Sequence, residues 1–102
     1  MNNRNKRSNP DHELYKAVLQ LQTVEECYNF FVDLCTVSEM KAMEQRYEVA
    51  KLLNQGMIYN DILEQTGASS ATISRVNRSL NYGTDTYRKL FARLEEDQAE
   101  EG

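Results

Sequence analysis

The sequence of 102 residues predicts an all-α fold of about six helices. Its composition favours helix, because Leu, Glu, Gln, Lys, Arg, Ala and Met are plentiful and there is one proline. Apolar residues recur with the spacing i, i+3, i+4, i+7 in several segments, and no alternating strand pattern exceeds three residues. A chain of this length forms one domain with a modest core, which dimerisation would enlarge.

The N-terminal third predicts an arm and two helices. Residues 1–8 are rich in Asn, Lys and Arg without apolar periodicity, which indicates a disordered basic arm. Asn9 as a cap and Pro10 in the first turn predict a helix that runs to about Gln22. Its apolar face would consist of Leu14, Ala17, Val18 and Leu21.

The second helix is expected to start at the capping box Thr23-Val24-Glu25-Glu26. It is apolar around more than half of its circumference, through Cys27, Tyr28, Phe30, Phe31, Leu34 and Cys35. So apolar a helix needs cover on several sides in a small protein, which indicates a subunit interface; the alternative is a compact monomer core. The two cysteines lack a CxxC spacing and lie in apolar surroundings, so they are expected to be buried free thiols; the alternative is a disulfide or a metal site.

The third helix is predicted from Val37 to about Asn54, after a second capping-box candidate, Thr36 to Glu39. Gly56 suits the left-handed position just past its end. Its buried stripe would comprise Met40, Met43, Tyr47, Ala50 and either Leu52 or Leu53.

Two short helices and a last helix follow. The fourth is expected from Tyr59 to Thr66, poorly capped by Ile58 and ended by Gly67, with Ile62 and Leu63 facing inward. The fifth would start after a cap at Ser69 or Ser70 and run to about Asn81, with its core face formed by Ala71, Ile73, Val76 and Leu80.

The sixth helix is predicted to follow the break at Asn81-Tyr82-Gly83, with Thr84 as its cap. Its apolar stripe would be Tyr87, Leu90, Phe91 and Leu94. From Glu95 onward the chain is expected to be solvated and frayed, and residues 97–102 form an acidic tail.

The fourth and fifth segments together predict a helix-turn-helix, with a reading head at about residues 59–81. A Gly-containing turn and a second helix with small polar residues and arginines suit insertion into a DNA major groove. Small residues at a helix start let its backbone approach the bases, and hydroxyls and amides there bind phosphates. The predicted DNA-binding residues are Ser69, Ser70, Ala71, Thr72, Ser74 and Arg78.

The distribution of charge permits phosphate binding although the net charge is −4. Residues 67–94 carry five basic side chains and one acidic side chain, a local charge of +4. The segment 95–102 carries five acids. A basic half beside an acidic tail allows one face to meet a nucleic acid, while solvated helix faces would give the same pattern.

Other function classes find little support. The sequence has one histidine, no nucleophile–base pair and no cluster of metal ligands, so an enzyme or a metal site is not expected. No apolar run is long enough for a membrane span, and the N-terminus does not match a signal peptide, so we expect a cytoplasmic protein. The alternative to a DNA-binding regulator is a helical protein–protein interaction module, or a small-molecule sensor, that has lost DNA binding.

Several segments of the chain resemble a known protein family. The stretches LCTVSEMKAMEQRYEVAKLLNQG and GASSATISRVNRSL resemble the Trp repressor superfamily. The segments ECYNFFVDLCTVSEM, QRYEVAKLL, TGASSATISRV and LNYG resemble its YerC/YecD-type branch. The resemblance covers about Leu14 to Leu94, within a predicted domain of residues 9–96. It implies a transcriptional regulator, or repressor, that is an intertwined helical homodimer on double-stranded DNA, with the fourth and fifth helices as the reading head.

The same resemblance implies a ligand site whose residues would be Thr36, Arg46, Arg75 and Ser79. In the family two arginines sandwich the indole ring of tryptophan, and Arg46 and Arg75 match their positions. Val76 stands where the family has glycine and would encroach on the ligand. The segment between Gly56 and Gly67 is also one residue shorter than its counterpart in the tryptophan repressor. We therefore expect that the protein has no cofactor and does not bind tryptophan. The alternative is a different small-molecule effector.

Without a ligand, the two arginines would tie the reading head to the core by pairing with acids such as Glu39, Glu44 or Glu48.

Overall fold

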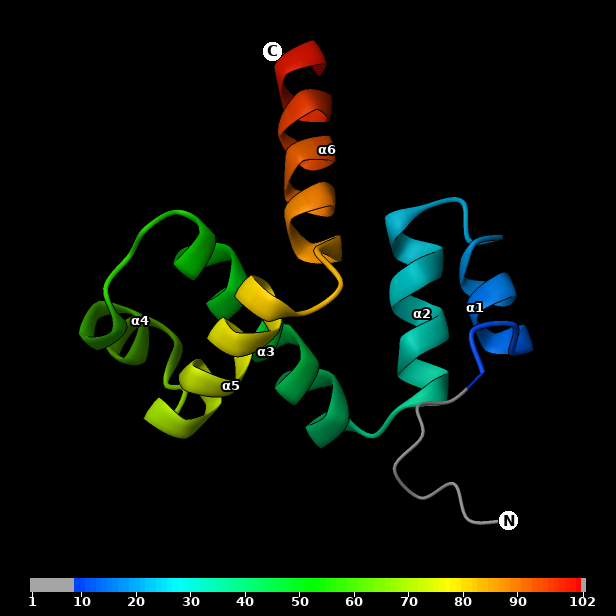
Figure 1. The fold of residues 1–102 in the computed structure, drawn as a ribbon. Helices are drawn as coiled ribbons and strands as arrows, with labels where there is room; N and C mark the ends of the chain where they lie inside the picture. The colour runs from blue at the N-terminus through cyan, green and yellow to red at the C-terminus, as the bar shows by residue number, and fades with distance from the viewer. Residues whose placement is uncertain (1–8, 102) are drawn as a thin grey trace. The chain divides into compact units, whose positions relative to one another are not determined.

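The computed structural model describes residues 9–101, with side chains through residue 99, so the predicted arm at residues 1–8 lies outside the described part. Between residues 9 and 101 there are six α-helices and no strand, as predicted (Figure 1). The helices are α1 (Glu13–Val18), α2 (Val24–Leu34), α3 (Val37–Asn54), α4 (Tyr59–Thr66), α5 (Ser70–Tyr82) and α6 (Thr86–Glu101). The chain divides into two compact units, Met1–Val37 and Ser38–Gly102.

Helix α1 is shorter than predicted at both ends. The predicted cap Asn9 instead closes a turn, since its Oδ1 accepts a hydrogen bond from Asp11 N at 2.8 Å. His12, which has no role in the sequence-based interpretation, caps the helix, because its Nδ1 accepts from Leu14 N at 3.1 Å. After Val18 the chain tightens into bonds between residues three apart, such as Gln20 N to Ala17 O at 3.0 Å. The helix therefore ends before Gln22.

Helix α2 begins at the predicted capping box. Thr23 Oγ1 accepts from Glu26 N at 3.0 Å, and the Glu26 carboxylate accepts from Gln22 N at 2.8 Å. Cys27 and Cys35 are free thiols, as predicted, but both are half-buried rather than buried. None of the residues of α1 or α2 is buried.

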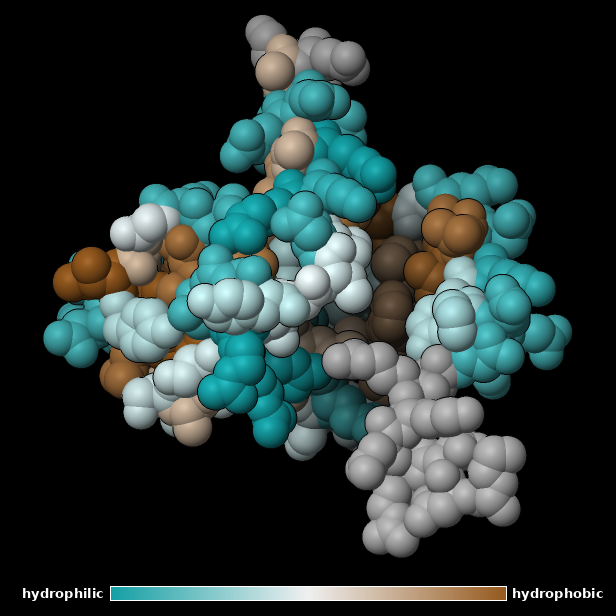
Figure 2. Space-filling view, viewed as in Figure 1, coloured by the Kyte–Doolittle hydropathy of each residue, from teal (hydrophilic) through white to brown (hydrophobic). Residues whose placement is uncertain are grey.

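The first unit therefore exposes large apolar side chains. Tyr28 is 57% exposed, Leu34 51% and Val32 44%. Figure 2 shows brown, apolar side chains on the surface of this unit. A helix with this much exposed apolar surface lacks the cover that its sequence requires.

The core of the second unit lies where α3, α4, α5 and α6 meet. Ile62, Ile73 and Val49 have the largest fully enclosed side chains. The full cluster is Val49, Ala50, Leu52, Ile62, Ala68, Ile73, Val76 and Phe91, with Leu53, Met57 and Tyr87 packed against it.

Several predicted core positions are corrected. Met40 and Met43 are half-buried and Tyr47 is 38% exposed, because only the C-terminal half of α3 contributes to the cluster, through Val49, Ala50 and Leu52. Leu63 on α4 is 44% exposed, and Leu90 and Leu94 on α6 are 41% and 46% exposed. Ala71 on α5 is exposed, and Ala68 in the preceding turn fills the core instead.

Gly56 ends α3 as predicted, with φ 89°. Met57 N donates to Leu52 O and Gly56 N to Leu53 O, both at 3.0 Å. These paired bonds form a Schellman motif, which needs a left-handed residue and an apolar contact beyond it. Met57 supplies that contact by packing against the core, so the turn directs the chain into α4.

Helix α6 differs from its prediction at both ends. It begins at Thr86, and the Thr84 hydroxyl lies 2.9 Å from the Thr86 hydroxyl rather than on a backbone amide, so Thr84 is not the cap. The first helical bond runs from Lys89 N to Asp85 O at 3.3 Å. The helix continues through Glu101, where fraying was expected. No helix in residues 9–101 has the length and apolar character of a membrane span.

Candidate nucleic-acid interface

Helices α4 and α5 pack against each other across a short turn, which gives a helix-turn-helix (Figure 1). Gly67 has φ 72°, and its amide donates to Leu63 O at 2.9 Å. The Thr66 hydroxyl donates to Ile62 O at 2.7 Å and accepts from Ala68 N at 3.1 Å. A left-handed glycine and a threonine that serves both sides of the turn thus fix the angle between the two helices.

The end of α4 is also held from α3. Gln45 Nε2 donates to the Thr66 carbonyl oxygen at 3.2 Å. That carbonyl belongs to the last turn of α4, where intrahelical partners run out. Gln45 was not singled out from the sequence, because contacts between residues far apart in the chain leave no trace in local periodicity.

The N-terminus of α5 is capped by Ser69. Its Oγ accepts from Thr72 N at 3.1 Å and donates to Thr72 Oγ1 at 3.1 Å. Two of the predicted DNA-binding hydroxyls, Ser69 and Thr72, therefore contact each other. The first helical bond of α5 runs from Ile73 N to Ser69 O at 3.0 Å, so the amides of Ser70 and Ala71 precede it.

The face of α5 opposite the core is exposed. Ile73, Val76 and Leu80 are buried on one side. At 100° per residue, the opposite side is centred on Ala71, Ser74 and Arg78, with Arg75 beside them and Ser70 at the flank. All five are exposed, and Thr72 is half-buried. The structure thus brings the predicted DNA-binding residues to one end and one face of the helix.

The outward face of α5 carries two positively charged side chains. The guanidinium groups of Arg75 and Arg78 form no hydrogen bond or ion pair with residues 9–99. Helix α5 has no acidic residue, whereas α4 carries Asp61 and Glu64. The positive charge of the head is therefore confined to α5 and available to a phosphate backbone.

Tyr82 extends this face and was missed from the sequence, where it was read as part of a helix break. It is the last residue of α5 and is 86% exposed. Its position four residues after Arg78 and eleven after Ala71 is the spacing that could have indicated it. An exposed tyrosine there can contact sugar and phosphate.

The residues of the implied ligand site do not all lie in one unit. Thr36 belongs to the first unit, whereas Arg46, Arg75 and Ser79 belong to the second, and all four are exposed. Arg46, like Arg75, makes no ion pair or hydrogen bond with another described residue. Val76 is 3% exposed and packs within the core. Both the ligand pocket and the tether between head and core stay predictions.

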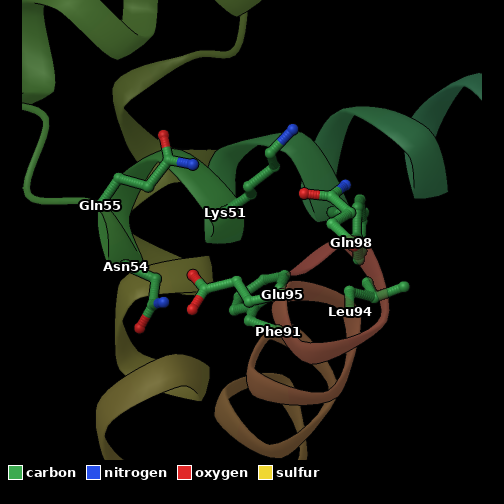
Figure 3. A pocket seen from close by; sticks show the side chains of 8 residues that line it. Lys51, Asn54, Gln55, Phe91, Leu94, Glu95 and Gln98 are labelled. Carbon is green, nitrogen blue, oxygen red and sulfur yellow. The ribbon is translucent and has the colours of Figure 1, made fainter. Parts of the chain in front are cut away.

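A groove of about 370 Å³ lies between α3 and α6 (Figure 3). Its lining combines the aromatic rings of Tyr47 and Phe91, whose centroids are 5.6 Å apart, with Leu94 and with polar side chains. Figure 3 shows Lys51 and Asn54 extending from α3, Gln55 from the turn just after it, and Leu94, Glu95 and Gln98 from α6. No group of three or more metal-ligating side chains occurs within the described residues.

Residues 11–95 match the family model of the Trp repressor protein. The chain belongs to the Trp repressor family. This confirms the resemblance drawn from the TGASSATISRV and QRYEVAKLL segments.

Relatives within this family extend the likeness over most of the chain. A protein of Bacillus subtilis (strain 168) named YerC and described as uncharacterized is 49% identical over 88 residues, which span 86% of this chain and 85% of that protein. The crystal structure of a TrpR-like protein from Eubacterium eligens ATCC 27750 has a TM-score of 0.79 at 54% identity, covering 81% of this chain and 86% of that one. A candidate Trp repressor from Staphylococcus aureus has a TM-score of 0.82 at 46% identity, covering 93% and 95%.

Proposed function

We propose that this protein is a homodimeric, sequence-specific DNA-binding transcriptional regulator that reads a major groove with α5. The observation that carries the proposal is the outward face of α5, where small and hydroxyl side chains lie beside two arginines that pair with none of residues 9–99, on a capped helix. Membership of the Trp repressor family supports the same function.

The dimensions of α5 suit this role. Its 13 residues make a rod of roughly 20 Å, and a major groove of about 12 Å admits one helix. Ala71 and Ser74 leave room for the backbone to approach base edges, and the amides of Ser70 and Ala71 can donate to a phosphate. Arg78 can contact a phosphate or a guanine. One such helix covers only a few base pairs.

A second copy supplies the remaining contacts. The exposed apolar side chains of α1 and α2 support a dimer, because a solvated α2 would leave Tyr28, Val32 and Leu34 uncovered. Two copies of α5 would then read half-sites about one helical turn apart. Sedimentation at micromolar concentration tests the dimer, which a stable monomer would contradict.

No cofactor is needed for this activity. Val76, which the family resemblance matches to a glycine, is buried, and its side chain belongs to the core. Isothermal calorimetry with tryptophan should therefore give no saturable heat. Saturable tryptophan binding in the wild-type chain would contradict this expectation.

The function is tested by a mobility shift with genomic DNA fragments at low and moderate salt. The double variant Ser74→Ala with Arg78→Ala should lose binding, because it removes a hydroxyl and a cation from the reading face. The matched control is Ser38→Ala with Arg93→Ala, which makes the same two changes at exposed positions outside the head. Undiminished binding by the first variant would reject α5 as the reading helix.

The competing function is a protein–protein interaction module without DNA binding. The net charge of −4 favours it, since like charges repel a polyanion at long range. A wild-type protein that retains no DNA fragment at low salt, yet captures a defined protein partner, would establish that alternative.

A further inference from the structure

The C-terminal end of α5 is held by a side chain from α6. Arg88 Nη1 donates to the Leu80 carbonyl oxygen at 3.0 Å, and Nη2 donates to Asn81 Oδ1 at 2.9 Å. The Asn81 amide in turn donates to Asn77 O at 3.0 Å and to Asn77 Oδ1 at 2.9 Å. Asp85 Oδ1 lies 3.9 Å from Arg88 Nη1. One guanidinium thus connects α6 to the last turns of the helix that faces DNA.

This contact stabilises the C-terminal end of α5. A helix leaves its last carbonyls without intrahelical partners, and its C-terminal end carries partial negative charge. The last turn of α5 contains no basic residue of its own. Arg88 supplies from the next helix both a donor for the Leu80 carbonyl and a positive charge.

The backbone of the turn between α5 and α6 restricts where Arg88 can lie relative to α5. A Cβ at Gly83 would overlap the Ser79 carbonyl oxygen, so the chain can pass there only without a side chain. Asp85 has φ 71°, a left-handed conformation that Asp adopts more readily than most residues. Leu80 is 3% exposed, so its carbonyl is fixed by a buried side chain. The position of Arg88 relative to α5 is therefore set by the backbone on both sides of the turn.

We propose that Arg88 is a positioning residue for DNA recognition, one that sets the angle at which α5 is presented from α6 without contacting DNA itself. This inference rests on the proposed function. The guanidinium of Arg88 is engaged by groups of the same chain, in contrast to those of Arg75 and Arg78. Because two copies must meet two half-sites together, a small rotation of α5 in each copy reduces specific binding more than nonspecific binding.

The test uses Arg88→Lys, which keeps the charge but replaces the planar fork by a single ammonium that cannot hold Leu80 O and Asn81 Oδ1 with the same geometry. Asn81→Ala removes the second acceptor while leaving Arg88 in place. The matched control is Arg93→Lys, the same change at an exposed α6 arginine without a partner among residues 9–99. Circular dichroism and thermal unfolding establish that each variant is folded.

Fluorescence anisotropy then measures binding of the full chain to a selected genomic site and to random DNA across a salt series. Arg88→Lys should weaken specific binding on the order of tenfold, because it disturbs hydrogen bonds made by a charged group. The affinity of the same variant for random DNA should fall much less. The salt dependence should remain that of the wild type, because no phosphate contact is removed. Asn81→Ala should act in the same direction, the double variant should be no worse than Arg88→Lys alone, and Arg93→Lys should match the wild type.

Specific binding by folded Arg88→Lys and Asn81→Ala equal to the wild type would overturn the inference and leave the proposed function standing. A shallower salt dependence, with equal losses on specific and random DNA, would also overturn it, because Arg88 would then contact phosphate directly. If Arg88→Lys does not fold, Asn81→Ala decides: specific binding equal to the wild type overturns the inference, and a loss confined to specific binding supports it. A wild-type chain that binds no DNA would reject both the proposed function and this inference.

Discussion

Removing Arg78 should change how DNA binding depends on salt, and not merely weaken it. Arg78 lies on the exposed face of α5, opposite the buried Ile73, Val76 and Leu80, and is not paired with a described residue. A cation in that position displaces counterions from DNA when it meets a phosphate, so each contact steepens the loss of affinity with salt. The Arg78→Ala variant removes one such contact per copy and leaves the core untouched.

The size of the effect follows from the number of arginines on the outward face of α5. Each α5 presents Arg75 and Arg78, so the proposed dimer would present four cations. At roughly −0.9 per phosphate contact, they contribute a slope of about −3.6 in log affinity against log salt, or roughly a 150-fold loss between ~50 and ~200 mM salt. Without Arg78 the contribution falls to about −1.8, or roughly a 12-fold loss over the same range.

Fluorescence anisotropy with a labelled genomic site, repeated across that salt range, measures both slopes. Other basic residues add equally to the two proteins, so the difference of about 1.8 is the quantity that tests the account. Arg93→Ala serves as the control, because it removes the same charge from an exposed position on α6. Equal slopes for Arg78→Ala, Arg93→Ala and the wild type would refute a phosphate contact by Arg78.

Three further substitutions test the packing that supports the reading face, each by urea or thermal unfolding. Gly67→Ala should cost about 1–2 kcal/mol, because φ is 72° and no atom lies within 4 Å of a new Cβ, so only backbone strain acts; unchanged stability would contradict the left-handed turn. Ile73→Ala should cost about 2–5 kcal/mol, because the side chain is fully buried between α5 and its neighbours; a loss below about 1 kcal/mol would place Ile73 outside the core. Gly83→Ala should destabilise more than Gly67→Ala, because its Cβ meets the Ser79 backbone; the opposite order would contradict the described turn between α5 and α6.

The part of the fold that local chemistry determines could be predicted from the sequence. The bounds of α3 and α4 agree with prediction because Gly56 and Gly67 adopt the left-handed conformation that ends each helix. Ser69 caps α5 as its hydroxyl allows, and Thr23 forms the predicted capping box with Glu26. In each case the deciding interaction joins residues no more than five apart, so the pattern is visible in the chain itself.

The rest depends on which segments meet. The burial of Val49 was not predicted, and the burial of Met43 was overestimated. The core cluster uses only the C-terminal half of α3, and helical periodicity does not indicate which half of a helix is covered. Ala71 was expected on the core face but is exposed, and Ala68, to which the sequence assigned no role, is buried. The apolar pattern does not distinguish a small residue in the core from one on the reading face. Contacts such as Gln45 to Thr66 and Arg88 to Leu80 join different helices and have no local signal.

Direct selection of genomic DNA by the purified protein is the most decisive measurement for the central claim that paired α5 helices read a specific sequence. Genomic fragments are incubated with the full chain at moderate salt, recovered with the protein and sequenced. If paired α5 helices read DNA, we expect strong enrichment of a few sites that share a two-fold repeat, with half-site centres about one helical turn apart. The variant Ser74→Ala with Arg78→Ala should lose that enrichment. Recovery of no fragments, or of all fragments without a shared repeat, would contradict the central claim.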